Sequence, residues 1–362
     1  MEVKENGEVA EGDSGKLPES PNDKFEIIRE DFYTFKDPED YLKLIKSYKL
    51  SDGSYQIVTL SNSNRYVRYN LTEEDLTIES VLQETYGTYE FDLISPDCIL
   101  ISAKDKPPYI KNWNDGTFSS FRCRNHLEEY ISPVSVKYSN NKAYFGFKNQ
   151  AQVFDITRMD KEKIIPLKKK MVLAIGVHED KDLLALGYQL HDLRTHKSFG
   201  AIPCTTGSGC TQVEFDDCYA LTAARNDNWV YLWDLRNDSQ PVENYYRDAQ
   251  TCQRMYFSFD QSTKRLLVGS KNGSVTLYDI HGRKVDSHFP IMFDCVSCCD
   301  IIDNQYLQVS STKDENPVSK YLCIAGSGQR HYKSFEASES DSEIEEENPA
   351  SEYRNAIRIF SF

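Results

Sequence analysis

Two consecutive segments of the chain, 210–236 and 252–286, repeat one pattern of short β-type runs and turns. In the first segment the runs cover Gln212–Phe215, Ala220–Ala223 and Trp229–Asp234, and they are rich in residues that favour strands. In both segments an Asp-containing turn follows the first run and a polar tip follows the second. The third runs end at Asp234 and Asp279, which are 45 residues apart. This spacing is typical of the blades of a WD-repeat β-propeller.

The same period extends along the rest of the chain. The third β-type run of each repeat ends 37 to 45 residues after the third run of the repeat before it, over the first six repeats. The interval from the sixth to the seventh is 82 residues. An acidic insertion at about 334–351 accounts for the excess in that interval. The third-run ends lie near Tyr69, Trp113, Phe154, His191, Trp233, Tyr278 and Phe360. The chain is therefore predicted to be all-β, a seven-bladed propeller over residues 23–362.

Two further segments carry expectations about the ring. Phe25–Ile28 reads as an isolated strand, and we expect it to close the ring by joining the last blade, because an open ring would expose sheet edges. Thr72–Leu82 is expected to form a short turn or helix between blades.

The net charge of −15 is concentrated at two places. Residues 1–22 form an acidic segment with few large apolar side chains, and 334–351 is a second acidic segment, so both are predicted to be disordered. The remainder is close to neutral and is therefore free to present a basic face to an anionic partner. Ser338, Ser340 and Ser342 alternate with acids, as kinase sites of the acidophilic type do; the alternative is a simple solvated loop.

Composition argues against several functional classes. No apolar run approaches 18 residues and the N-terminus has no secretory pattern, so neither a membrane span nor secretion is expected. The ten cysteines are expected to be reduced. The Cys295-x-x-Cys298 spacing lacks a second pair, so no metal site is predicted. We expect no catalytic residues, no cofactor and no small-molecule substrate, because no nucleotide loop or nucleophile–base pattern is present.

Cations recur in the two kinds of connection that share one face of a propeller. These are the connections between second and third strands and those between blades. The residues are Lys104, Lys106, Lys148, Arg225, Lys271 and Arg330 from the first kind, and Arg124, Lys168–Lys170, Arg247 and Arg254 from the second, with Asn125 and His126 beside Arg124. Tyr109, Tyr130, Tyr246 and Tyr332 lie nearby in sequence. Arginine suits phosphate and base edges, and aromatic rings stack on unpaired bases, so RNA is the predicted ligand.

Several motifs in register resemble a known family, the telomerase Cajal body proteins. The resemblance covers 32–71, 220–236 and 268–282, and it includes Asn125-His126-Leu127, Cys252-Gln253-Arg254 and Ser327-Gly328-Gln329-Arg330. It implies a monomeric nuclear propeller that recognises the CAB-box loop of small Cajal-body RNAs or telomerase RNA. It also implies escort of the ribonucleoprotein, with its core H/ACA-type proteins, in the Cajal body or nucleoplasm.

A protein-only role is the alternative. Trp233-Asp234-Leu235-Arg236 fits the WD-x-R pattern through which some propellers resemble cullin-ligase substrate receptors, so Trp233, Asp234 and Arg236 are candidate protein-binding residues. The same four residues are also the end of a blade strand.

Overall fold

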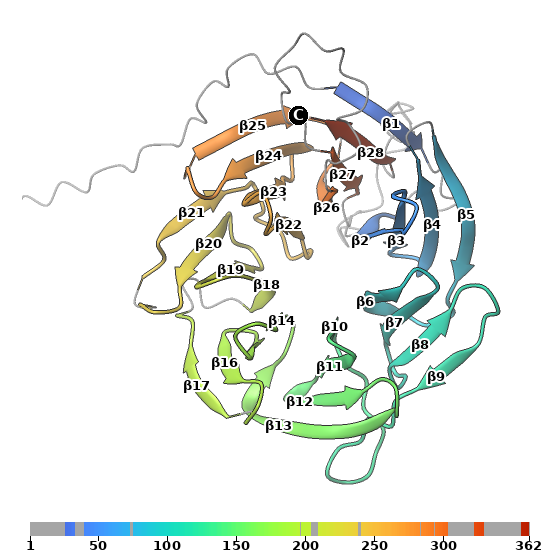
Figure 1. Cartoon of the computed structure of the whole chain (residues 1–362), viewed down its shortest axis with the longest axis vertical. Helices are drawn as coiled ribbons and strands as arrows, with labels where there is room; N and C mark the ends of the chain where they lie inside the picture. The colour runs from blue at the N-terminus through green and yellow to red at the C-terminus, as the bar shows by residue number, and fades with distance from the viewer. Residues whose placement is uncertain are drawn as a thin grey trace, which may run out of the picture.

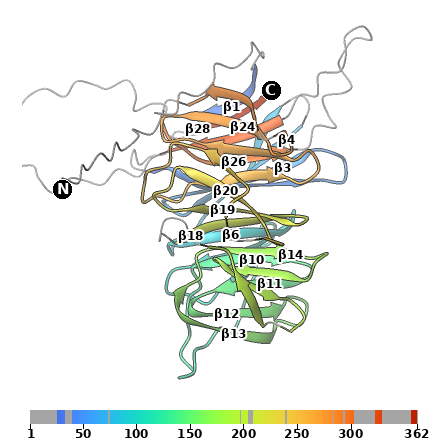
Figure 2. The same cartoon turned by 90° about the vertical axis from the view of Figure 1, so that its left-hand side faces the viewer.

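The computed structural model describes residues 26–32, 40–72, 75–195, 197–203, 209–237, 240–282, 284–292, 294–302, 322–328 and 356–361. Their regular secondary structure is entirely β, in seven four-stranded antiparallel sheets. The sheets stand around a ring like the blades of a propeller (Figure 1), and the ring forms a disc when it is seen from the side (Figure 2). The predicted seven-bladed propeller is confirmed. Residues 1–22 and 334–351 lie outside the described residues.

Each of the first three blades is a meander whose first strand lies nearest the centre of the ring (Figure 1). Blade 1 contains β2 (Leu42–Lys49), β3 (Tyr55–Ser61), β4 (Arg65–Leu71) and β5 (Leu76–Gln83). Blade 2 contains β6 (Thr88–Ser95), β7 (Cys98–Ala103), β8 (Tyr109–Asn112) and β9 (Phe118–Ser120). Blade 3 contains β10 (Ser135–Ser139), β11 (Lys142–Gly146), β12 (Lys148–Asp155) and β13 (Asp160–Met171).

The next three blades repeat this order. Blade 4 contains β14 (Ile175–His178), β15 (Leu183–Leu186), β16 (Gln189–Asp192) and β17 (Ser198–Ala201). Blade 5 contains β18 (Cys210–Asp216), β19 (Tyr219–Ala224), β20 (Trp229–Asp234) and β21 (Glu243–Tyr246). Blade 6 contains β22 (Phe257–Asp260), β23 (Arg265–Gly269), β24 (Ser274–Asp279) and β25 (Lys284–Pro290).

Blade 7 joins the two ends of the chain. Its inner strands are β26 (Val296–Ile302), β27 (Leu322–Ser327) and β28 (Ala356–Ser361), and its outer strand is β1 (Glu26–Phe32). β1 pairs antiparallel with β28, from Glu26 opposite Ser361 to Phe32 opposite Ala356. The strand predicted at 25–28 therefore closes the ring, as expected. Pairing the N-terminal strand with the last blade gives β28 a partner on both sides.

The core lies between neighbouring blades and is built from the middle strands. Every residue of β3 is buried, because this strand has a hydrogen-bonded neighbour on each side and a blade packed on each face. Aromatic rings fill the spaces between sheets, as in the edge-to-face cluster of Phe121, Phe145 and Phe154. This packing explains why a chain rich in Phe and Tyr is suited to stacked sheets.

Two local expectations were wrong. The segment expected to be a turn or helix contains β5, which pairs with β4 from Leu76 opposite Leu71 to Gln83 opposite Arg65. The unsatisfied edge of β4 and the apolar positions of the segment outweigh any helical preference. Lys168 and Lys170 belong to the long strand β13 and not to an inter-blade loop.

Because strands alternate in direction, the connections fall on two faces of the disc. We define the upper face by the connections between second and third strands and between blades, and the lower face by the remaining turns. Backbone hydrogen bonds join connections of the same face, from Lys271 N to Asp248 O at 2.7 Å on the upper face and from Leu235 N to Cys218 O at 2.8 Å on the lower face.

Candidate nucleic-acid interface

Only some of the sequence-predicted cations within the described residues are exposed on the upper face, and these are not all in one place. Lys104, Arg225 and Lys271 are exposed in connections between second and third strands of blades 2, 5 and 6. Arg124, Asn125 and His126 lie between β9 and β10. Arg330 lies outside the described residues, as do Ser338, Ser340 and Ser342.

A hollow of about 820 Å³ opens on the upper face where blades 2 and 3 meet. Its lining combines aromatic rings, cations and amides, chiefly Tyr89, Lys106, His126, Tyr130, Lys148 and Asn149. The side chains of Tyr89 and Tyr130 are 41% and 57% exposed, which is unusual for rings of this size. The hollow therefore offers flat apolar surfaces beside positive charge.

Arg124 and Tyr130 form one unit at the edge of this hollow. The Arg124 guanidinium lies 4.9 Å from the centroid of the Tyr130 ring and donates a hydrogen bond of 3.2 Å to its hydroxyl. A second nitrogen of Arg124 pairs with Glu128 at 2.9 Å. The hydrogen bond from Arg124 lowers the pKa of Tyr130, and the same bond raises the pKa of Arg124. The ring is thereby held in a fixed orientation with one face toward a cation.

Asn125 shapes the loop rather than presenting its amide to a ligand. Its side-chain oxygen accepts hydrogen bonds from the backbone N–H groups of Leu127 and Glu129, at 2.8 and 3.0 Å, and its Nδ2 donates to the Glu129 carboxylate at 2.8 Å. This is the local turn for which Asn is well suited. The turn leaves His126 exposed and Leu127 64% exposed at the surface.

A second cation–aromatic pair lies in the same region. The ammonium nitrogen of Lys106 is 4.1 Å from the centroid of the Tyr86 ring, and Tyr86 is 42% exposed. A hydrogen bond from Lys106 lowers the pKa of the Tyr86 hydroxyl. Neither Tyr86 nor Tyr89 was predicted from the sequence as a site residue. Tyr86 lies beside Gly87 in the connection between β5 and β6, and that position was the available signal; Tyr89 is the second residue of β6.

Two arginines predicted for the upper face turn inward. Arg247 is 2% exposed and donates to the carbonyl of Met255 at 2.9 Å; burial lowers its pKa to about 10. Arg254 is half-buried and donates to the hydroxyl of Tyr256 at 3.2 Å. Burial lowers the pKa of Arg254, but the charges of Tyr256 and Glu90 outweigh burial and raise it. Both side chains therefore point toward the interior of the ring, where the carbonyl of Met255, the hydroxyl of Tyr256 and the carboxylate of Glu90 lie.

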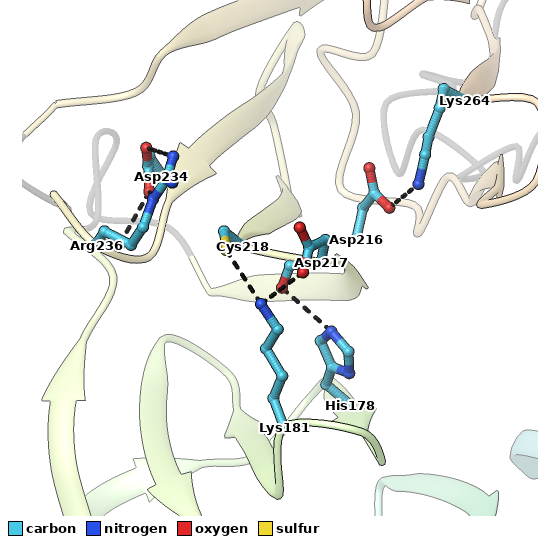
Figure 3. Close-up of polar contacts among 8 residues, drawn as sticks. All are labelled: His178, Lys181, Asp216, Asp217, Cys218, Asp234, Arg236 and Lys264. Carbon is cyan, nitrogen blue, oxygen red and sulfur yellow. Dashed lines mark hydrogen bonds and ion pairs between the residues drawn. The ribbon is translucent and has the colours of Figure 1, made fainter.

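The WD-x-R segment lies on the lower face. Trp233 is 1% exposed and its Nε1 donates to Thr222 Oγ1 at 2.9 Å, so the structure places this candidate protein-binding residue in the core. Arg236 is exposed, but it makes two bonds of 2.8 and 2.7 Å to the carboxylate of Asp234 (Figure 3). The guanidinium is thus engaged within its own turn.

Within the described residues, no cluster of three or more His, Cys, Asp or Glu side chains could hold a metal ion. Cys295 and Cys298 are buried, and burial raises the pKa of each thiol to about 12. Both side chains belong to the core, because each is only 1% exposed. The described part of the chain also contains no helix with the length and apolar character needed to cross a membrane.

The chain is similar in sequence to several curated proteins. No protein-family model matches the chain. Telomerase Cajal body protein 1 of Bos taurus is 27% identical over 286 residues, which are 69% of this chain and 52% of that protein. The Homo sapiens protein is 28% identical over 280 residues, covering 68% and 50%, and the Drosophila melanogaster homolog is 24% identical over 234 residues, covering 59% and 42%.

The chain resembles the telomerase Cajal body proteins. This confirms the resemblance read from the sequence motifs. The chain spans about half the length of the telomerase Cajal body relatives it matches. The names of these relatives place those proteins with telomerase and the Cajal body.

Proposed function

We propose that the protein is a non-catalytic RNA-binding propeller that recognises the CAB-box loop of a small Cajal-body RNA or telomerase RNA. The observation that carries the proposal is the upper-face hollow between blades 2 and 3, which combines exposed tyrosines with Lys106 and Lys148. Unpaired bases stack on such rings, and lysines neutralise the phosphates between them.

The distribution of charge favours the upper face for an RNA strand. Exposed cations of this face come from blades 2, 3, 5 and 6, at Lys104, Lys148, Arg225 and Lys271. The described turns of the lower face carry aspartates at most blade ends, at Asp97, Asp155, Asp182, Asp192, Asp217, Asp234, Asp260 and Asp279, and most of these aspartates form ion pairs with lower-face cations such as Lys181, Arg194 and Arg236. The lower-face cations thus lie beside aspartates, whereas the upper-face hollow sets Lys106 and Lys148 beside aromatic rings, so an anionic strand with unpaired bases is attracted more to the upper face.

The names of the relatives support the partner in this proposal. Those proteins are named for telomerase and the Cajal body. We extend this to the present chain as escort of a telomerase or guide-RNA particle, with its H/ACA-type core proteins, by a monomeric propeller in the nucleus.

Affinity for a CAB-box hairpin, measured by fluorescence anisotropy, tests the proposal. Tyr130→Ala is expected to weaken binding by about tenfold, because stacking on one ring contributes about 1–3 kcal/mol. Tyr130→Phe retains the ring and should bind nearly as well as the unaltered protein. Tyr48→Ala is a matched control, since Tyr48 is 37% exposed near the lower end of β2.

A hairpin with a mutated loop separates specific from general RNA binding. The unaltered protein should prefer the CAB-box loop, and Tyr130→Ala should remove most of that preference. Equal affinity for the two hairpins would contradict recognition of the loop, and no binding to either would contradict the RNA-binding function itself.

A further inference from the structure

The lower face has a hollow of its own, on the side opposite the proposed RNA site. It has a volume of about 380 Å³ and lies between the lower ends of blades 4 and 5. The two blades are joined here by side chains: Lys181 of blade 4 contacts Asp217 and Cys218 of blade 5, at 2.6 and 3.1 Å (Figure 3). Nothing in the RNA-binding proposal uses this region.

The hollow has an apolar lining with one exposed aromatic ring. Leu183 and Leu235 contribute aliphatic surface, and Phe199 of β17 is 64% exposed. A phenylalanine on an outer strand does not need this exposure for blade packing, because Leu190 and Ile202 already fill the core of blade 4. An exposed ring beside a hollow with charged edges is typical of a protein-docking site.

The cations around this hollow are already paired with carboxylates of the protein. Arg194 bonds to Asp192 at 2.9 Å and lies 3.4 Å from Asp182, so one guanidinium serves two acids. Lys181 is held by Asp217, and Arg236 makes two bonds to Asp234. Each of these cations thus has a carboxylate partner within the protein, although Arg194 and Arg236 stay 71% and 64% exposed.

The carboxylates are accessible as well, and they outnumber the cations: Glu179, Asp180, Asp182, Asp192, Asp217 and Asp234 lie here with Lys181, Arg194, Lys197 and Arg236. The side chains of Asp217 and Asp182 are 72% and 46% exposed, and Glu179 and Asp180 are exposed in the same turn of blade 4. Negative charge therefore exceeds positive charge along this edge. A ligand that brings Lys or Arg to these acids while inserting an apolar side chain would satisfy both properties of the site.

From this combination we propose that the lower-face hollow between blades 4 and 5 docks a short protein segment in which a bulky apolar residue is flanked by Lys or Arg. Phe199 and Leu235 would contact the apolar side chain, and Asp182 and Asp217 the flanking cations. The protein would then hold RNA on one face and a basic protein segment on the other. The docking site depends on neither the identity of the RNA nor its binding.

Labelled 12-residue peptides provide the test. The probe series has a central Phe or Leu flanked on both sides by Arg and Lys; in the first matched series Glu replaces the cations, and in the second Ser replaces the apolar residue. Only the probe series should bind the unaltered protein in fluorescence anisotropy, and its affinity should fall as salt is raised.

Variants then locate the binding. Phe199→Ala is expected to lower the affinity of the protein for the probe peptide by about tenfold, because a central aromatic contact is lost. Phe118→Ala is its control, because Phe118 is 69% exposed on the outer strand of blade 2, away from the hollow. Asp182→Asn should lower the affinity for the probe peptide several-fold. Asn tolerates the φ of 50° at this position, so the turn is retained.

The control for charge is Asp105→Asn, because Asp105 also has a positive φ, of 58°, but lies on the upper face. Equal binding of all three peptide series, or an unchanged affinity in Phe199→Ala, would overturn the proposal. Preference for the Glu series would assign the hollow to an acidic partner, and Phe199-dependent self-association in ultracentrifugation would assign it to a second copy. Each of these results would also overturn the proposal. RNA affinity measured on Phe199→Ala and Asp182→Asn should be unchanged, because both residues lie on the lower face.

Discussion

Asp300 and Ser47, 253 positions apart in the chain, join the last blade to the first. The Asp300 carboxylate on β26 accepts hydrogen bonds from the backbone N–H and the hydroxyl of Ser47 on β2, at 3.0 and 2.6 Å. Its other oxygen accepts from Ser258 of blade 6 at 2.8 Å. One side chain thus connects three blades at the inner wall of the ring, next to the seam that β1 closes.

Ser47→Ala is therefore expected to destabilise the fold by about 1–2 kcal/mol, because it removes a hydrogen bond to a charged acceptor. Burial already raises the pKa of Asp300, so the carboxylate depends on its remaining donors. The free energy of unfolding in urea measures the effect. Ser80→Ala makes the same chemical change at a buried hydroxyl of blade 1 that has no hydrogen-bond partner in the described structure, and it should be nearly neutral. Equal costs for the two variants would contradict a role of Ser47 at the seam.

The Asp234–Arg236 pair gives a pH dependence. The hydrogen bond from Arg236 lowers the pKa of Asp234 to about 2, below the value of about 3.9 expected in the unfolded chain. Because the folded pKa is the lower one, the pair stabilises the fold above about pH 4, and this contribution is lost as the pH falls toward 2. Arg236→Ala should raise the pKa of Asp234 toward its ordinary value, as followed by carboxyl NMR titration, while the backbone N–H of residue 236 still donates to the carboxylate. An unshifted Asp234 in the unaltered protein would contradict the pairing.

Gly273 occupies a turn that no other residue fits. Its φ is +84°, and a Cβ at this position would lie 2.1 Å from the carbonyl oxygen of Met292. Gly116 has a φ of +69° with open space around it, so Gly116→Ala should cost about 1–2 kcal/mol from backbone conformation alone. Gly273→Ala should cost more, because the backbone of the connection between β25 and β26 must also move. Thermal unfolding of the two variants measures the difference, and equal costs would show that crowding is unimportant.

Lys148 offers a test of phosphate contact on the upper face. It is exposed and lines the hollow between blades 2 and 3. Each phosphate contact to single-stranded RNA contributes about 0.7 to the slope of log affinity against log salt concentration. Lys148→Ala should reduce the slope by about this amount, whereas Lys197→Ala on the lower face should leave it unchanged. The same slope for both variants would place the RNA elsewhere.

Much of the fold could be predicted because the determining signals are local. Third strands that end near an aromatic residue or His191 recur at the blade period, and the polar tips at Arg225–Asn228 and Lys271–Gly273 both became turns between second and third strands. The segment at 72–82 was misread because the strand β5 depends on β4, its partner in the blade. Outer strands receive less of their stability from their own residues than from the neighbour they pair with.

The sequence by itself determined the number of blades, the closing strand and the face on which each connection lies, because a repeated alternation of strand and turn leaves one way to close a ring. The tertiary structure alone decided which side chains on a face work together. It turned Arg247 and Arg254 inward, used the Asn125 amide to hold a loop, and gathered Tyr89 and Tyr130 around one hollow. Side-chain direction and pairing depend on contacts between blades, and those contacts join residues that the sequence keeps far apart.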